Sequence, residues 1–506
     1  MNKTLYKKTF LLAVVSVACQ LVNIIRDIVL AKTLGASSLN DIYLVSQSVI
    51  SLFVSMVNSP LATAYVPVAT KYFVSNDKKE RNSFLSTIYS DILLLSVILI
   101  AVARIFVNPI IQVMAPGFNV ENKKILVIML SIQLPIIAIN LIKGIDRGNF
   151  QIFQSFNISE ITNIIPNIFM VAYLILVGEY VNIYVVAITL TVGTFISLIP
   201  EVVLLRKKGI RFRFRPGFNK DIETMLKLMV AALITTAIRE VNVVVDQSVG
   251  SLLPSGSITM LSYGSKITVV VVSLFSTSVS IVGFANIAKL QYENNENAIF
   301  NIIENSLNVL NFIIIPVAGY FIVFAEDIVN ILYVRGNFSH SDGLITANII
   351  RFYSIGLIGY GFQDVLTRSL HAFKIVKCTM KASAIMVGTN VVLDLLLYRK
   401  FGVNGLAFAT TVSMLVIIPG LIKDSRKYIG RYNLSVVIKE STKIFIATLL
   451  TALVGLFLDS KFGGSISSFI INSLICGGVY VSCCFLLKSL TLQNIVEIIK
   501  SNRNKI

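Results

Sequence analysis

Three cations in otherwise apolar stretches are the residues of this sequence best suited to bind a ligand. They are Arg26, Lys266 and Arg239. Arginine forms paired hydrogen bonds with phosphate and lysine offers a mobile point charge, so cations that line a cavity suit an anionic substrate. In a first alternative, Arg26 snorkels to the lipid headgroups from near a helix end. In a second, each cation neutralises a nearby carboxylate, for which the candidates are Asp27, Glu240 and Asp246.

A second group of polar residues carries oxygen atoms. Asn390 and Asp394 are four residues apart, so on a helix both project from one face. With Asp246 and Thr410 they supply two carboxylates, an amide and a hydroxyl, which are hard donors of the kind that hold a small hard cation. A sodium or proton site is one hypothesis. A hydrogen-bonded cluster that ties helices together is the other, and spacing alone favours it.

Other chemistry is not indicated. The two histidines, His340 and His371, lie in predicted loops, and no pair of nucleophile and base stands out. No Gly–Lys loop that could cradle a phosphate is present, so ATP hydrolysis is not expected. The five cysteines show no paired spacing, which argues against a disulfide framework and a zinc site. We expect no enzymatic activity and no cofactor except Na⁺ as a coupling ion.

The composition is that of a membrane protein. Of the 506 residues 55% are hydrophobic and 14% are charged, with a mean hydropathy of +0.80, whereas soluble domains carry about 25% charged residues. We predict an all-α polytopic membrane protein with about fourteen transmembrane helices. Their predicted centres lie near Ala18, Phe53, Leu95, Ile132, Ile168, Ile188, Leu233, Val270, Asn311, Gly356, Met386, Ala409, Leu449 and Ile475.

The basic residues alternate with the predicted spans. The net charge of +18 comes mostly from short loops such as KYFVSNDKKERN, KGIDR, RKKGIRFRFRPGFNK and KDSRKYIGRYN, while the loops between them are poor in Lys and Arg. This is the positive-inside pattern, not the footprint of a nucleic-acid partner. It predicts that both termini are cytoplasmic. The tail LTLQNIVEIIKSNRNK is predicted to be an amphipathic helix at the membrane interface.

An internal repeat divides the chain. VNIIRDIVLAKTLGASSL, which starts at Val22, aligns without a gap with VNVVVDQSVGSLLPSGSI, which starts at Val241, at an offset of 241 − 22 = 219. Five of the eighteen positions are identical, and each copy opens a predicted six-helix half. We predict two pseudo-symmetric six-helix lobes that rock about a shared site. The predicted bounds are 1–205 and 224–422 for the lobes, 206–223 for a basic linker, and 423–506 for two further helices with the tail.

An ordered set of motifs points to a family. NIIRDIVLAKTLGASSLNDIYLVSQ is followed by AYVPV, MAPGF, PSGSITMLSYGSKI and LYVRGNF. This set resembles the MurJ/MviN lipid II flippases of the multidrug/oligosaccharidyl-lipid/polysaccharide exporter superfamily, over about the first twelve spans. The resemblance implies export of lipid II, an undecaprenyl-pyrophosphate-linked precursor, from the inner to the outer leaflet of the bacterial inner membrane by alternating access. It also associates the two last helices with a groove for the lipid tail.

The resemblance assigns roles to single residues. Its substrate-binding positions are Arg26, Asp41, Lys266 and Thr259. Arg239 joins them as a candidate because of its place in an apolar stretch, not because of the resemblance. The sodium-site positions that the resemblance implies are Asp246, Asn390, Asp394 and Thr410. Two arginines and one glutamate of the family pattern are missing, and the residues in their places are Gln20, Phe53 or Val54, and Val269. The cavity is therefore expected to be less cationic than in well-marked members.

We predict a lipid II flippase that is driven by a cation and the membrane potential and acts as a monomer among membrane lipids. The missing arginines leave open another lipid-linked glycan as cargo, such as a capsule or O-antigen unit. A cation-coupled multidrug exporter would need an apolar or acidic cavity, which Arg26 and Lys266 argue against. A membrane scaffold without transport is the remaining alternative, and the lack of a predicted soluble docking domain argues against it.

Overall fold

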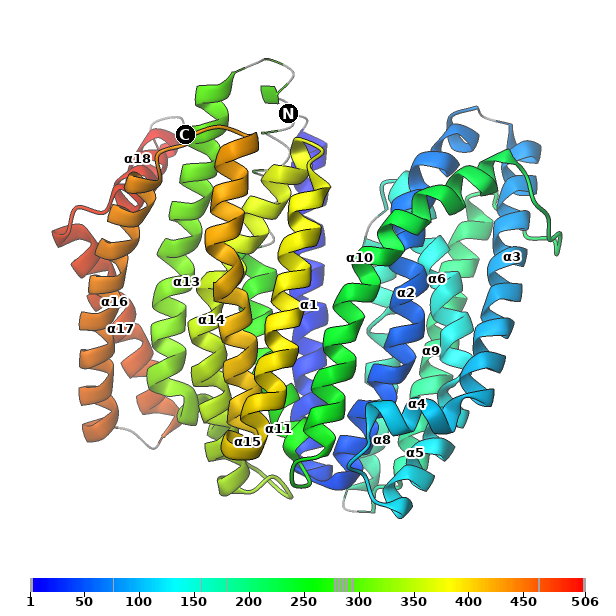
Figure 1. Ribbon diagram of the computed structural model, residues 1–506, viewed down its shortest axis with the longest axis horizontal. Helices are drawn as coiled ribbons and strands as arrows, with labels where there is room; N and C mark the ends of the chain where they lie inside the picture. The colour runs from blue at the N-terminus through cyan, green and yellow to red at the C-terminus, as the bar shows by residue number, and fades with distance from the viewer. Residues whose placement is uncertain are drawn as a thin grey trace. The chain divides into compact units, whose positions relative to one another are not determined.

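The structure is a computed structural model. It describes residues 3–75, 77–155, 157–178, 180–276, 295–462 and 465–503, with six single residues between 277 and 294. Within these residues every regular element is a helix, which confirms the all-α prediction (Figure 1). The end of the predicted eighth span, beyond Ser276, lies outside the described residues.

The chain forms two compact units. The first extends through Thr259 and includes Arg335–Phe338, and the second comprises Met260–Val334 and the residues from Ser339 onward. The helices of the first unit are α1 (Lys3–Leu34), α2 (Ser38–Val74), α3 (Lys78–Ile105), α4 (Val107–Met114), α5 (Val120–Gln133), α6 (Pro135–Ile152), α7 (Asn157–Thr162), α8 (Ile165–Val177), α9 (Ile183–Lys207) and α10 (Lys220–Ser251).

The second unit continues the chain from the first turn of α11. Its elements are α11 (Ser257–Val271), the π-helical turn η1 (Val272–Ser276), α13 (Glu296–Leu332), α14 (His340–Ala372), α15 (Val376–Tyr428), α16 (Leu434–Phe462), α17 (Ile466–Leu486) and α18 (Leu490–Arg503). The predicted lobe boundaries are based on sequence similarity, whereas the two units are defined by packing, and α10 packs within the first unit. The lobe boundaries therefore stay a prediction.

Short polar residues fix where the helices begin. Asp77 accepts hydrogen bonds from the backbone N–H groups of Lys79 and Glu80, at 2.8 and 3.1 Å, at the start of α3. Ser339 and Asp342 form a reciprocal capping box at the start of α14. Such caps satisfy donors that the helix itself leaves unpaired. Ser38 and Ser257, which are equivalent in the repeat, are the first residues of α2 and α11.

Several helices are long and apolar enough to cross a membrane. Among the described residues there are nine of them, or up to eleven if each of two bent pairs is one span. One such pair is α5 with α6, bent by 42°. The chain is thus a multi-pass membrane protein, and the count of about fourteen spans is consistent with this range.

The helix α15 contains a chain reversal. Gly402 breaks its helical geometry with φ 56° and ψ −138°. A Cβ atom on Gly405 would lie 2.9 Å from the carbonyl oxygen of Leu397, which shows that the chain folds back closely on itself there. The predicted spans centred near Met386 and Ala409 are the two arms of this helical hairpin (Figure 1).

The end of α1 is completed by a distant segment of the first unit. The backbone N–H of Asn337 donates to the carbonyl oxygen of Lys32 at 3.0 Å, and its side-chain Nδ2 donates to the carbonyl oxygen of Thr33 at 2.6 Å. The carbonyl groups in the last turn of a helix lack intrahelical partners. The loop between α13 and α14 therefore caps the C-terminus of α1.

Candidate functional site

Arg26 is held by polar neighbours of the first unit. Its Nε and Nη2 donate to Asp27 Oδ1 at 3.0 and 2.9 Å, and its Nη1 donates to Asn167 Oδ1 at 3.0 Å. Asp27 is 1% exposed, so Arg26 neutralises a buried carboxylate, as the second alternative for the cations requires. The Arg26 side chain keeps 18% exposure, so it is not fully enclosed by its neighbours.

Asp41 and Thr259, both predicted to bind substrate, contact each other. Asp41 Oδ1 accepts hydrogen bonds from the backbone N–H and the hydroxyl of Thr259 at 2.8 and 2.7 Å, and its Oδ2 accepts one from the N–H of Gly256 at 2.7 Å. Both side chains are buried. A carboxylate at the first turn of a helix satisfies free N–H groups and complements the helix dipole. In this structure Asp41 caps the start of α11.

The helix α10 carries Arg239 and Asp246. Arg239 is exposed, and Asp246 accepts a hydrogen bond from Asn242 Nδ2 at 3.2 Å. Glu240, a candidate counter-ion for the cations, accepts a hydrogen bond from the hydroxyl of Ser55 on α2 at 2.7 Å. Polar contacts of this kind tie α10 to α2 inside the first unit.

Lys266 lies in the second unit on α11. Its Nζ is 5.4 Å from the ring centroid of Tyr263. The Tyr263 ring stacks on that of Tyr333, with centroids 4.7 Å apart and an interplanar angle of 17°. An ammonium group at this distance from an aromatic face is attracted by its quadrupole.

Three of the predicted cation-site residues come together in the hairpin of α15. Asn390 Nδ2 donates to Thr410 Oγ1 at 3.3 Å across the two arms. Asp394 lies one turn beyond Asn390, and the two are 0% and 1% exposed. A buried carboxylate with amide and hydroxyl oxygens fits a small hard cation. The fourth residue, Asp246, lies in the first unit.

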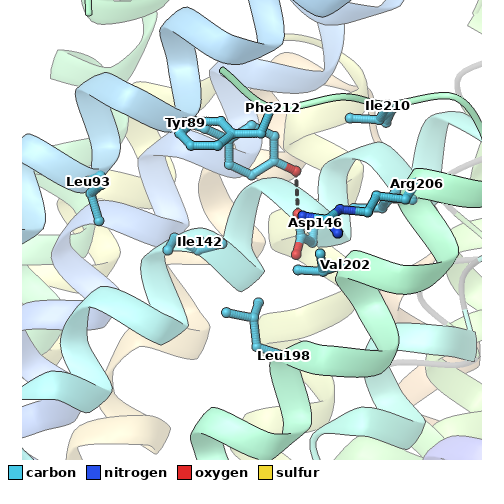
Figure 2. Close-up of a pocket in the computed structure, with 10 residues that line it drawn as sticks. Tyr89, Leu93, Ile142, Asp146, Leu198, Val202, Arg206, Ile210 and Phe212 are labelled. Carbon is cyan, nitrogen blue, oxygen red and sulfur yellow. Dashed lines mark hydrogen bonds between the residues drawn. The ribbon is translucent and has the colours of Figure 1, made fainter. Parts of the chain in front are cut away.

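The first unit contains a buried polar network that was not predicted from the sequence. The prediction of a loop at KGIDR is wrong. These residues lie in the interior of α6, and Lys143 and Asp146 are buried. Tyr89 on α3 donates a hydrogen bond to Asp146 (Figure 2). Asn149 Nδ2 donates to Tyr89 Oη at 2.9 Å, and Tyr65 Oη donates to Asn149 Oδ1 at 2.5 Å.

The same network continues to α9. Lys143 Nζ donates to Ser197 Oγ at 2.8 Å and lies 3.7 Å from Glu201 Oε1. The hydroxyl of Thr162 on α7 donates to Glu201. The signal in the sequence was the spacing of three between Lys143, Asp146 and Asn149, which places them along one side of a helix.

A cavity of about 210 Å³ opens beside this network. Asp146 lies at its wall with Tyr89, and Arg206 points toward it from α9 (Figure 2). The remaining lining residues are Leu93, Ile142, Leu198, Val202, Leu205, Ile210 and Phe212. The cavity is thus mostly apolar with a few polar groups, as ligand pockets generally are.

The predicted basic linker is bound to α3 by its backbone. The N–H groups of Arg213 and Arg215 donate to the hydroxyls of Ser86 and Ser90 at 3.1 and 2.8 Å. The N–H of Gly217 donates to a carboxylate oxygen of Asp91 at 3.1 Å. Side chains on α3 therefore fix this extended segment within the first unit.

The second unit contains an apolar cavity of about 390 Å³ between α13, α14, α15 and α16. Its wall includes Ile315 of α13, Ile358 and Phe362 of α14, and Phe445 of α16. Asn311 Nδ2 donates to Ser441 Oγ at 2.8 Å at the same place. Such a lining accommodates a hydrocarbon chain without leaving polar groups unpaired.

Comparison with known proteins gives the chain relatives along almost its whole length. A family model described as lipid II flippase MurJ matches residues 7–475. A probable lipid II flippase MurJ of Thermotoga maritima is 25% identical over 496 residues, which cover 98% of each chain. Another, from Buchnera aphidicola, is 25% identical over 459 residues and 88% of each chain.

Solved structures share the fold. The chain is similar to a lipid II flippase MurJ in an inward closed conformation, with a TM-score of 0.82, 24% identity, and coverage of 96% of this chain and 100% of that one. It is also similar to an inward-facing multidrug resistance MATE family transporter, with a TM-score of 0.67, 11% identity, and coverage of 82% and 98%. At 24% and 11% identity, the similarity to these structures establishes the fold of this chain.

Proposed function

This chain belongs to the lipid II flippase MurJ family, and from that premise we propose that it moves lipid II from the inner to the outer leaflet of the bacterial inner membrane. The observation that carries the proposal is the family match over residues 7–475, which extends from α1 into α17. The family is one of transporters, not of enzymes. Alternating access between the two halves of the chain is the mechanism proposed for the movement.

The pyrophosphate of the cargo is the part that cations would hold. Arg26 keeps solvent exposure beside its partners, and Arg239 is exposed on α10. The ammonium group of Lys266 sits over the ring of Tyr263. Phosphate oxygens bind arginine through paired hydrogen bonds and lysine as a point charge. Asp41 and Thr259 act less directly, because they are bonded to each other and hold the start of α11.

The polyprenyl tail of the cargo calls for an apolar surface. The cavity between α13, α14, α15 and α16 supplies one in the second unit, next to the helices that follow the repeat. This cavity is where we place the portion of the tail nearest the protein.

A coupling cation is part of the proposal. Asn390, Asp394 and Thr410 present hard oxygen donors in one place, and Asp246 is the fourth predicted ligand. Sodium bound there would offset the charge of the buried Asp394 carboxylate. The membrane potential adds about 2.3 kcal/mol for each elementary charge moved through 100 mV. Both ion and potential would bias the transport cycle outward.

We also propose the orientation and the oligomeric state. From the basic loops we propose that both termini lie on the cytoplasmic side. One chain supplies both units, so we propose that a monomer among membrane lipids is the working form.

The test is complementation with two matched variants. A bacterial host is depleted of its own lipid II flippase, this chain is expressed, and lipid II in the outer leaflet is assayed. Arg26→Ala alone would strand the buried Asp27 charge at about 3–5 kcal/mol, which confuses binding with folding. The informative pair is therefore Asp27→Asn, which keeps the cation, and Arg26→Ala/Asp27→Asn, which removes both charges.

We expect rescue by the wild type and by Asp27→Asn, and loss of transport in the folded double variant. Transport by the double variant at the wild-type rate would remove Arg26 from the site. Failure of the folded wild type to rescue would exclude lipid II and favour another lipid-linked glycan, with Gln20 and Val269 as the reason. Replacing sodium by choline in proteoliposomes tests the coupling ion, since rates unchanged by this exchange would exclude sodium.

A further inference from the structure

The buried network of the first unit contains an unequal number of charges. Lys143, Asp146 and Glu201 are 6%, 1% and 0% exposed. They come from α6 and α9, which pack against each other. Two carboxylates and one ammonium leave one negative charge uncompensated among the three. A buried charge without a partner is strongly disfavoured, so a further positive species is expected there.

The two carboxyl groups act on each other. Asp146 on α6 and Glu201 on α9 interact electrostatically across the contact between these helices. Among the described residues, Asp146 Oδ2 and Glu201 Oε2 are buried oxygens without a hydrogen-bond donor. Ionised carboxylates are acceptors only, so two such oxygens repel unless one of them carries a proton.

The other oxygens of the pair already have donors. Asp146 Oδ1 accepts from the hydroxyl of Tyr89, and Glu201 Oε1 accepts from the hydroxyl of Thr162 and lies 3.7 Å from Lys143 Nζ. Each carboxyl group thus has one oxygen bound to a hydroxyl donor and one buried oxygen without a donor. A single proton between the partners completes every hydrogen bond of the pair.

The pair has a route to solvent. Asp146 lines the cavity of about 210 Å³, and the exposed Arg206 stands at the same cavity (Figure 2). The titratable or charged groups that the surrounding helices bring to the pair are Tyr65 of α2, Tyr89 of α3, Lys143 of α6, Glu160 of α7, and Arg206 of α9. Glu160 is paired with Arg147 at 2.7 Å, so its charge is already balanced.

We propose that Asp146 and Glu201 together hold one exchangeable proton, so that the network is a proton-binding site of the first unit, open to solvent through the cavity. With the proton bound, the O–H of one carboxyl donates to the other, and the net charge of the pair with Lys143 is zero. Release of the proton to water leaves two carboxylates facing each other, and their repulsion loosens the contact between α6 and α9.

The test reads the proton itself and needs no cargo, so it is independent of the proposed function. The full-length chain is placed in lipid nanodiscs, and the infrared C=O stretch of protonated carboxyl groups is recorded in H₂O and D₂O while the pH is raised. The variants are Asp146→Asn and Glu201→Gln. The matched control is Asp91→Asn, because the Asp91 carboxylate on α3 accepts from a backbone N–H.

We expect each of the two variants to remove the same deuterium-sensitive band, with a loss of one carboxylic-acid equivalent per chain, and the control to keep it. Bands unchanged in both variants would mean that both carboxyls are ionised, with Arg206 as the extra cation. Different bands lost in the two variants would mean two separate acids. Either outcome overturns the shared proton.

Tyr89→Phe covers the case in which a charge-removing variant does not fold. It keeps both carboxyl groups and deletes one hydrogen bond to Asp146. The shared-proton band is then expected to change frequency, because Asp146 Oδ1, an oxygen of the pair, loses its donor. A band that stays in place when Tyr89 is replaced would overturn the assignment to this pair.

Discussion

At the level of single residues, polar side chains inside the helices are bound to one another. Asp41 is bonded to Thr259 and Gly256, and Arg26 to Asp27 and Asn167. A charged side chain at membrane depth is costly unless it has such a partner. Candidate binding residues therefore also hold the helices in place, and experiments must separate these two roles.

Asp41 gives the residue-scale prediction. Asp41→Ala leaves the N–H groups of Gly256 and Thr259 without acceptors in a buried place, at about 1–3 kcal/mol. We expect the purified variant to unfold at a lower temperature in detergent. Thr259→Ser, which keeps the hydroxyl, is the matched control and is expected to melt close to the wild type. A melting temperature for Asp41→Ala equal to that of the wild type would rule out the capping role.

The sequence predicted part of the candidate site. The spacing of Asn390 and Asp394 put them on one helix face, and the structure adds Thr410 from the other arm of α15. The sequence did not predict the partners of Asp146. Tyr89 and Glu201 lie 57 and 55 positions away (146 − 89 and 201 − 146), and no local pattern links them to Asp146. Contacts at such separation depend on packing and not on pattern.

At the level of elements, hydropathy located the helices well and their interruptions poorly. Every predicted span centre lies inside a helix, because about twenty apolar residues are needed to cross the hydrocarbon core. KGIDR was predicted to be a loop because charged residues normally lie at the membrane surface and not in a span. Inside α6 its charges are paired with groups from α3, α7 and α9.

The chain reversal in α15 gives the element-scale prediction. Gly402 has φ 56°, which a side chain tolerates only at about 1–3 kcal/mol. We expect Gly402→Ala to lower the thermal stability of the protein and, through the displaced arms, to weaken the proposed sodium binding. Gly388→Ala is the control on the same helix, since a Cβ atom there meets nothing within 4 Å. Equal melting temperatures for the two variants would mean that the reversal does not depend on glycine.

At the level of the whole molecule, the basic loops predict which ends face the cytoplasm. In a variant without its five native cysteines, Asn433→Cys lies in the loop before α16 and Tyr180→Cys in the loop before α9. A maleimide that cannot cross membranes should label position 180 in intact spheroplasts, and position 433 only after permeabilisation. The reverse labelling pattern would contradict the proposed orientation. Spheroplasts that carry the variant without any cysteine give the background labelling.

The cap on α1 has a consequence for how the chain is made. Asn337, which closes the last turn of α1, is separated from Thr33 by 304 positions. A ribosome that adds about 5–20 residues per second needs roughly 15–60 s to produce the intervening chain. During that interval the C-terminus of α1 lacks this contact. The assembly of the first unit is therefore finished only after the part of the second unit that precedes Arg335 has been synthesised.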